Sequence, residues 1–209
     1  MFQWTLHLIS GLAFVHRKEV VVANLSLGNC WLSSGPKLSL SLVGFPDAGF
    51  KYSVYGGYVY EGEDRIFEDW SILPTHTPRL PNTQTDIFLY GCVVYQLMTG
   101  TWPNSPSQQS GSGLPTPTPE SPRGSWPSLE ADYMGEIVRK CWACEYEDAD
   151  AVKAAVVTFM EDLGWEVEGD NDLKGLDVTD LFLDEVRGSA PVDPNEGDAE
   201  QINLGALRV

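Results

Sequence analysis

One segment decides the fold of this chain: Asp86-Ile87-Phe88-Leu89-Tyr90-Gly91-Cys92-Val93-Val94-Tyr95-Gln96-Leu97-Met98. Apolar residues occupy almost every position, so no polar stripe is left to face water. A helix that is apolar on all sides has to be buried inside a protein. We therefore expect residues 86–98 to form the central buried helix. Gly91 in its middle predicts close packing by the segment 20–29, because a mid-helix glycine is tolerated where a larger side chain has no room.

The first 43 residues predict a helix followed by short strands. Apolar residues recur at helical spacing over residues 1–16. Short apolar runs at 20–22 and 30–32 predict two strands. Over residues 37–43 leucine alternates with serine, which predicts a half-buried strand that pairs as a hairpin.

Four segments occur in the order found in the C-terminal lobe of protein kinases. Residues 8–16 resemble the kinase helix that ends in G-L-x-Y-L-H. Residues 20–29 resemble the catalytic loop H-R-D-x-x-x-x-N and the strand before it. Residues 86–103 resemble D-V-W-S-F-G-V-L-L-Y-E-L-L-T-G-x-x-P, and residues 137–142 resemble the later I-x-x-C-W. The chain thus resembles the protein kinase superfamily, in particular divergent fungal kinase-like proteins with a degenerate catalytic loop.

The resemblance implies an α+β fold, mainly α-helical with short β-hairpins, in which the N-terminal lobe is missing. It implies a kinase-like C-terminal lobe over residues 1–164, with an irregular activation segment at 44–85. Residues 103–127 are rich in Pro, Ser and Gly, which predicts a disordered loop inside that lobe. Residues 169–209 are acidic and predict a largely disordered tail.

The resemblance also assigns a role to each position of the catalytic loop. Asn24 stands at the position of the catalytic base, and Ser26 at that of the lysine that clamps the transferred phosphate. Asn29 matches the metal-binding asparagine, while Leu42 stands where the D-F-G aspartate would bind the metal. Asp86 matches an aspartate that holds the catalytic-loop backbone, which is a structural role.

These replacements predict that catalysis has been lost. An amide such as that of Asn24 cannot accept a proton, and a positioned base contributes about 10²–10⁴ in rate. One neutral amide, Asn29, cannot hold Mg²⁺ alone, and we do not expect Asp47, beyond a proline, to replace the missing carboxylate. We therefore expect a catalytically inactive pseudokinase fragment that acts as an interaction module, with no cofactor.

Two alternatives remain open. In the first, the chain is a truncated gene model of a Ser/Thr-type protein kinase with ATP binding and phosphotransfer. ATP and Mg²⁺ belong only to that alternative, because the Gly-rich loop and the lysine–glutamate pair would precede residue 1. In the second, the chain is a decayed fragment without a selected function.

The composition of the chain limits the classes of partner that we expect. The net charge of −17 argues against nucleic acid, whose phosphates require basic residues. No apolar run reaches the ~18 residues of a membrane helix, so no membrane is expected, and the protein is expected in the cytoplasm or nucleus. The Cys141-x-x-Cys144 pair lacks further metal ligands in sequence and is interpreted as core packing.

A missing N-terminal lobe predicts an open cleft face. Apolar side chains near Val22, Leu27 and Leu42 are expected to be exposed there. Exposed apolar patches mark interaction surfaces. We therefore expect a protein partner at the exposed cleft face.

Overall fold

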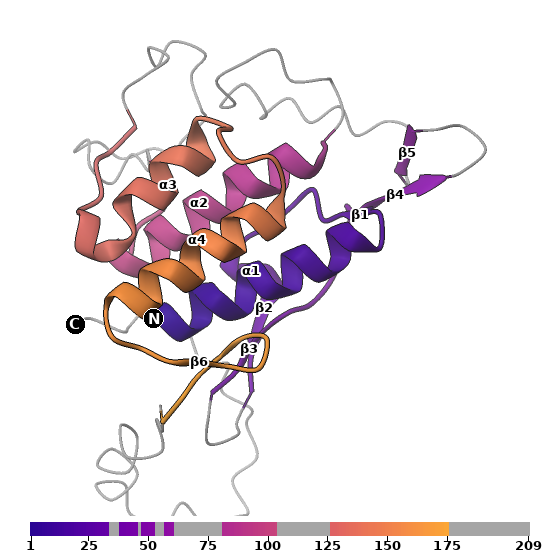
Figure 1. The fold of residues 1–209 in the computed structure, drawn as a ribbon. Helices are drawn as coiled ribbons and strands as arrows, with labels where there is room; N and C mark the ends of the chain where they lie inside the picture. The colour runs from indigo at the N-terminus through magenta and orange to yellow at the C-terminus, as the bar shows by residue number, and fades with distance from the viewer. Residues whose placement is uncertain (34–37, 46, 53–56, 61–80, 104–125, 176–209) are drawn as a thin grey trace, which may run out of the picture. The chain divides into compact units, whose positions relative to one another are not determined.

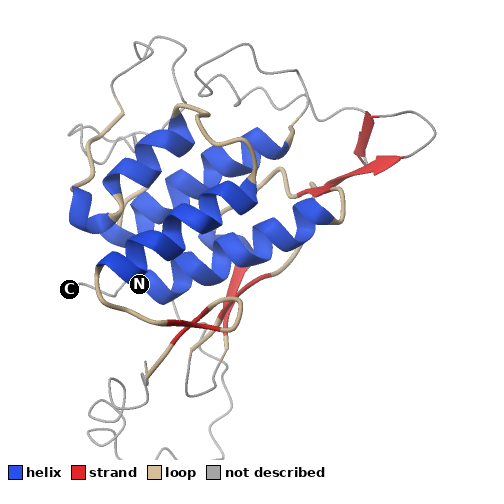
Figure 2. Cartoon of the chain, in the orientation of Figure 1, coloured by secondary structure: helices blue, strands red, loops and turns tan. Residues whose placement is uncertain are grey.

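A computed structural model describes residues 1–33, 38–45, 47–52, 57–60, 81–103 and 126–175. All of them belong to one compact unit, Met1–Leu176. This part of the chain is a mixed α+β fold, as expected (Figures 1 and 2). Its α-helices are α1 (Phe2–Arg17), α2 (Thr83–Thr99), α3 (Gly135–Trp142) and α4 (Ala149–Asp162).

The strands form small antiparallel sheets. Within the described residues one sheet has the order β1-β4-β5, and the other two are the pairs β2-β3 and β6-β7. The strands are β1 (Val20–Val21), β2 (Cys30–Leu32), β3 (Leu40–Leu42), β4 (Gly49–Tyr52), β5 (Gly57–Tyr60), β6 (Val167–Glu168) and β7 (Asp172–Leu173). The described residues also form two short 3₁₀ helices, η1 (Leu27–Asn29) and η4 (Ala131–Tyr133).

Local signals fix both ends of α2. Asn82 caps its first turn, because the Asn82 side chain accepts the Thr85 backbone N–H while the Thr85 hydroxyl accepts the Asn82 N–H. Gly100 ends the helix in the left-handed conformation that suits glycine. The predicted central helix is therefore confirmed, extended by three residues at its start and one at its end.

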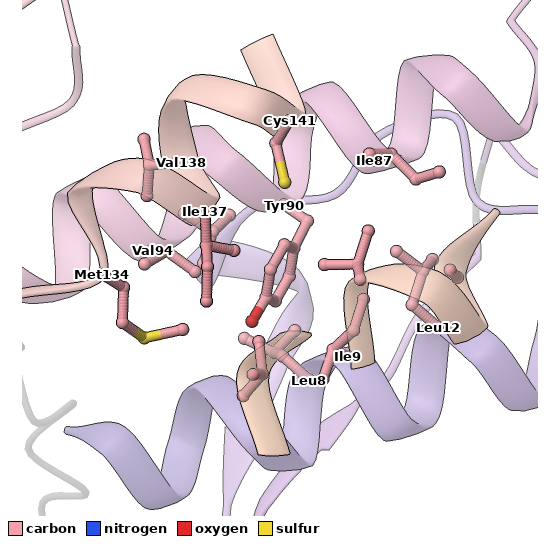
Figure 3. Close-up of a cluster of buried hydrophobic side chains, with 14 of the residues drawn as sticks. Leu8, Ile9, Leu12, Ile87, Tyr90, Val94, Met134, Ile137, Val138 and Cys141 are labelled. Atoms are coloured by element: carbon pink, nitrogen blue, oxygen red, sulfur yellow. The ribbon is translucent and has the colours of Figure 1, made fainter. Parts of the chain in front are cut away.

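The core lies between the helices. Helix α1 packs against α4, and α2 packs against α3 (Figure 1). Tyr90 is fully buried and reaches from α2 toward α1, where its hydroxyl donates to the carbonyl of Thr5 at 3.2 Å (Figure 3). Around it lie the apolar side chains Leu8, Ile9, Leu12, Ile87, Val94, Met134, Ile137, Val138 and Cys141.

Gly91 packs against α3, so the prediction that the segment 20–29 packs there was wrong. A Cβ atom at Gly91 would lie 2.9 Å from the Cβ of Cys141 and 3.1 Å from Cδ1 of Trp142. These separations leave no room for a side chain. Glycine lets α2 and α3 approach closely, which compensates for its lower helix propensity.

The interval 44–85 is not irregular throughout, as the sequence had suggested. Strand β4 pairs with both β1 and β5, with Phe50 opposite Val20 on one side and Val59 on the other. The resulting hairpin lies beyond the C-terminal end of α1 (Figure 1). Residues 46, 53–56 and 61–80 of the expected activation segment lie outside the described residues.

The predicted loop 103–127 also needs correction at its end. Trp126 is half-buried, and its ring lies 5.3 Å from that of Phe88 and 5.0 Å from that of Trp142. Aromatic pairs at such distances are stabilising. Residues 104–125, on which the prediction of disorder mainly rests, lie outside the described part.

The acidic tail begins later than predicted, because residues 169–175 belong to the folded unit. Strands β6 and β7 pair on either side of Gly169, and Leu173 is buried. The Gln3 side chain donates to the carbonyl of Asn171 and accepts the N–H of Leu173, each at 2.7 Å. Residues 176–209, the rest of the predicted tail, lie outside the described residues.

Candidate functional site

Asp86 anchors the loop that follows β1. Its side chain is fully buried in the first turn of α2. One carboxylate oxygen, Oδ2, accepts the backbone N–H of Val22 at 2.7 Å and lies 2.9 Å from Nε2 of His16. The other oxygen, Oδ1, accepts the N–H of Ala23 at 2.8 Å. The loop backbone is thereby fixed to the central helix, and His16 of α1 completes the cluster.

This anchoring holds the loop in a strained shape. Ala23 has a φ of +65°, in the left-handed region that costs a non-glycine residue about 1–2 kcal/mol. Ala23 is fully buried, and Val22 is only 1% exposed. The prediction that Val22 is exposed was therefore wrong, because the carboxylate of Asp86 draws the loop into the core.

Beyond the anchor, the asparagine side chains bind within the loop. Asn24 is exposed, and its Nδ2 donates to Oδ2 of Asp47 at 2.9 Å. Asn29 donates through Nδ2 to the carbonyl of Asn24 at 2.6 Å. Ser26 accepts the Asn29 backbone N–H at 3.0 Å through its own carbonyl oxygen. The structure thus gathers Asn24, Ser26 and Asn29 in one loop and adds Asp47, which the sequence had left aside.

Leu42 lies inside the β2–β3 hairpin and does not follow it. It pairs with Cys30 and packs against the hydrophobic core. The pairing continues one step further, because the N–H of Val43 donates to the carbonyl of Asn29 at 2.8 Å. Gly44 is the first residue beyond this pairing and has a φ of +71°. A metal-binding residue placed directly after the paired strand would therefore be Gly44, and Gly44 has no carboxylate either.

The described side-chain donors around this loop include two neutral amides and one carboxylate, that of Asp47. Mg²⁺ prefers near-octahedral oxygen ligands that include one or two carboxylates. Asn24 and Asn29 offer neutral amides, Leu42 and Gly44 offer no side-chain oxygen, and the Asp47 carboxylate is engaged by Asn24. In the described part of the chain, no group of three or more His, Cys, Asp or Glu side chains is arranged to hold a metal ion.

Three of the exposed large apolar side chains among the described residues lie on β2 or just after β3. Trp31 is 72% exposed, Leu32 is 40% exposed and Phe45 is 42% exposed. Leu27 and Leu42, which were expected to be exposed, are half-buried and pack against the core. The sequence reading missed Trp31, although strand alternation after Cys30 would have turned it away from the half-buried Cys30.

Burial affects the thiol groups of all four cysteines. Burial raises the pKa of the Cys30 thiol to about 11 and that of Cys92 to about 12. It also raises the pKa of Cys141 and Cys144. Because the thiolate is the reactive form, burial lowers the reactivity of these thiols at neutral pH. Cys141, fully buried against α2, serves the packing of the core.

Comparison with protein-family models finds no match for this chain, and none of the curated proteins matches it. Among the described helices, none has both the length and the apolar content needed to cross a membrane.

Proposed function

We propose that this chain is a protein-kinase-like domain without phosphotransfer activity that acts as a protein-interaction module. The observation that carries the proposal is the pair of hydrogen bonds that the Asp86 carboxylate accepts from the backbone N–H groups of Val22 and Ala23. A helix aspartate that holds the backbone just before the base position is what the kinase resemblance implies. The same loop carries Asn24 at that base position.

The chemistry of this loop supports a loss of catalysis. Phosphoryl transfer depends on positioning and on neutralising developing charge. Asn24 cannot accept a proton, Ser26 brings no positive charge, and neither Leu42 nor Gly44 brings a carboxylate. A base, a phosphate clamp and a metal ligand are therefore lacking together. The anchoring by Asp86 remains useful without them, because it stabilises the fold.

The exposed side chains of Trp31, Leu32 and Phe45 support the interaction role. In the proposed fold, the β2–β3 hairpin lies beneath the cleft face. Large aromatic and aliphatic side chains at a surface are the usual anchors of a protein partner. We propose that a protein partner covers this face.

A phosphotransfer assay tests the catalytic half of the proposal. The purified chain, with labelled ATP, Mg²⁺ or Mn²⁺ and generic acceptor proteins, should transfer no more label than a blank. The Asn24→Asp variant should also stay at the blank, because a base alone does not supply the missing metal ligand. Transfer that Asn29→Ala abolishes would refute this half.

A dye-binding assay tests the surface half. A hydrophobic fluorescent dye should bind the wild-type chain, and the double variant Trp31→Ser/Leu32→Ser should bind severalfold less. Phe14→Ser is the matched control, because Phe14 is 55% exposed on α1. Equal dye binding by the double variant and the control would show that the β2 surface is not the accessible apolar face.

A second candidate is a nucleotide-binding kinase, of which this chain is one part. The observation that favours it is the Asp47 carboxylate, which lies 2.9 Å from Nδ2 of Asn24 and so stands beside the base position. A ligand at a hundredfold excess over its Kd stabilises the native state by about 2.7 kcal/mol. An upward Tm shift with ATP–Mg²⁺ that Asp47→Asn removes would favour this candidate, and no shift would exclude nucleotide binding by this chain.

A further inference from the structure

The ring of His7 joins three separate parts of the fold. His7 lies on α1 and is only 5% exposed. Its Nδ1 accepts the backbone N–H of Leu40, on β3, at 3.0 Å. Its Nε2 lies 3.5 Å from Oδ1 of Asp172, on β7, and also contacts Nε2 of Gln3.

The hydrogen bonds around the ring determine which ring nitrogen, Nδ1 or Nε2, carries the hydrogen of the neutral form. A backbone N–H can only donate, so the bond from Leu40 requires a bare Nδ1. The Gln3 amide is oriented by Asn171 and Leu173, so that it too presents an N–H to the ring. Both ring nitrogens therefore face donors, and a neutral imidazole has one bare nitrogen.

One tautomer meets more of these partners. A hydrogen on Nε2 leaves Nδ1 bare for Leu40 and donates toward Asp172, while it opposes the N–H of Gln3. A hydrogen on Nδ1 would serve the contact with Gln3 but would oppose the N–H of Leu40. The neutral ring with its hydrogen on Nε2 therefore satisfies both β3 and β7.

We propose that His7 is a proton-sensitive clasp that holds the β2–β3 hairpin on α1 when neutral and releases Leu40 when it gains a second proton. That proton must go to Nδ1, where it replaces the lone pair that Leu40 uses. The same proton strengthens the attraction to Asp172, because the ring becomes positive. At acidic pH, His7 therefore loses its hydrogen bond to β3 and is attracted more strongly to β7.

Release of Leu40 would loosen the hairpin without freeing it. The Trp4 indole still donates to the carbonyl of Leu38 at 2.8 Å, and Leu42 still packs against the core. The strand paired with β3 is β2, whose Trp31 is the most exposed large apolar side chain among the described residues. Protonation of His7 therefore loosens the hairpin that carries the surface we assign to a partner. The inference itself rests only on the contacts of His7.

Two acidic side chains among the described residues, Asp170 and Asp172, come from β7 and the turn before it. Asp172 faces the ring from β7, and β3 presents only its backbone to Nδ1. Nearby Asp170 is held by Nζ of Lys153 at 2.6 Å, and this hydrogen bond lowers the pKa of Asp170. Asp170 therefore keeps its charge at the mildly acidic pH where histidines gain a proton, ordinarily near 6.5.

Hydrogen exchange of the Leu40 amide tests the proposal directly. After correction for intrinsic exchange, its protection should be full above the titration of His7 and should fall about tenfold per pH unit below it, since one proton favours the released state. The Val94 amide, in the buried helix α2, should stay protected as an internal control. Constant protection of Leu40 between pH 7.5 and pH 5 would overturn the proposal.

Two variants and one spectrum separate the clasp from a general loss of stability. In His7→Gln the side-chain oxygen can accept from Leu40 but cannot titrate, so protection should not change with pH. Asp172→Asn should move the loss of protection to lower pH, because the charged ring loses a favourable partner. Ring ¹⁵N shifts of the wild-type chain need no variant to fold and should show hydrogen on Nε2 at pH 7.5. A hydrogen on Nδ1, or an unchanged pH response in His7→Gln, would contradict the inference.

Discussion

Replacing Asp86 by asparagine keeps the shape of the side chain and removes its charge. The carboxylate accepts two backbone N–H groups and contacts the ring of His16, with Val22 and His16 on one oxygen and Ala23 on the other. Asparagine has one acceptor oxygen, so it can serve one side only. If that oxygen faces Val22, the new NH₂ group opposes the N–H of Ala23.

The magnitude follows from these contacts. A hydrogen bond to a charged group contributes about 1.5–3 kcal/mol, and a buried donor left without a partner costs about 1–3 kcal/mol. Asp86→Asn loses one such bond outright and weakens the others by removing the charge. We expect the free energy of unfolding to fall by about 2–4 kcal/mol, a large part of the ~5–15 kcal/mol of a typical domain.

Urea unfolding of wild type, Asp86→Asn and Asp132→Asn measures this loss. Asp132 is exposed in η4, so its variant should stay within about 0.5 kcal/mol of wild type. Hydrogen exchange should also show the amides of Val22 and Ala23 losing protection in Asp86→Asn. An Asp86→Asn chain as stable as the Asp132→Asn control, with both amides still protected, would refute the anchoring role.

Other substitutions test the packing. Gly91→Ala should lower the free energy of unfolding by about 1–2 kcal/mol. The new Cβ would lie 2.9 Å from that of Cys141, and the cost of this overpacking exceeds the gain in helix propensity. An unchanged or higher Tm would contradict this prediction. Trp126→Ala should cost about 2 kcal/mol by removing two aromatic contacts, whereas unchanged urea unfolding would show that the segment is not packed. Deletion of 169–209 should lower the Tm because it removes β7; a Tm equal to that of the wild-type chain would show that β7 does not stabilise the fold.

The central helix could be predicted because its sequence allows a single environment. From residue 86 to residue 98 apolar side chains leave no polar face, so burial follows from composition alone. The β2–β3 hairpin was predictable for a similar reason, since the alternation around Leu40 and Leu42 matches the period of a strand. Both signals are local, and both were confirmed.

The rest could not be predicted because it depends on contacts between distant segments. Burial of Val22 follows from a carboxylate at Asp86, 64 residues later. The packing of Trp126 depends on rings of α2 and α3, while its neighbours in sequence predict only a loop. Leu173 is a lone apolar residue in an acidic stretch, and no periodic pattern marks its strand. Asp47 lies beside Asn24 through loop geometry that its sequence separation does not reveal.

The contacts of Gln3 also govern when the protein can finish folding. This third residue bonds to the backbone at Asn171 and Leu173, across separations of 168 and 170 residues. Folds rich in such distant contacts close slowly, because a long chain must be ordered before these contacts form. During synthesis at ~5–20 residues per second, α1 leaves the ribosome roughly ten to thirty seconds before its last partners exist. Throughout that interval the parts of α1 that pack against α4 and β7 lack their final cover, although β1, β3 and α2, which also pack against α1, are made earlier.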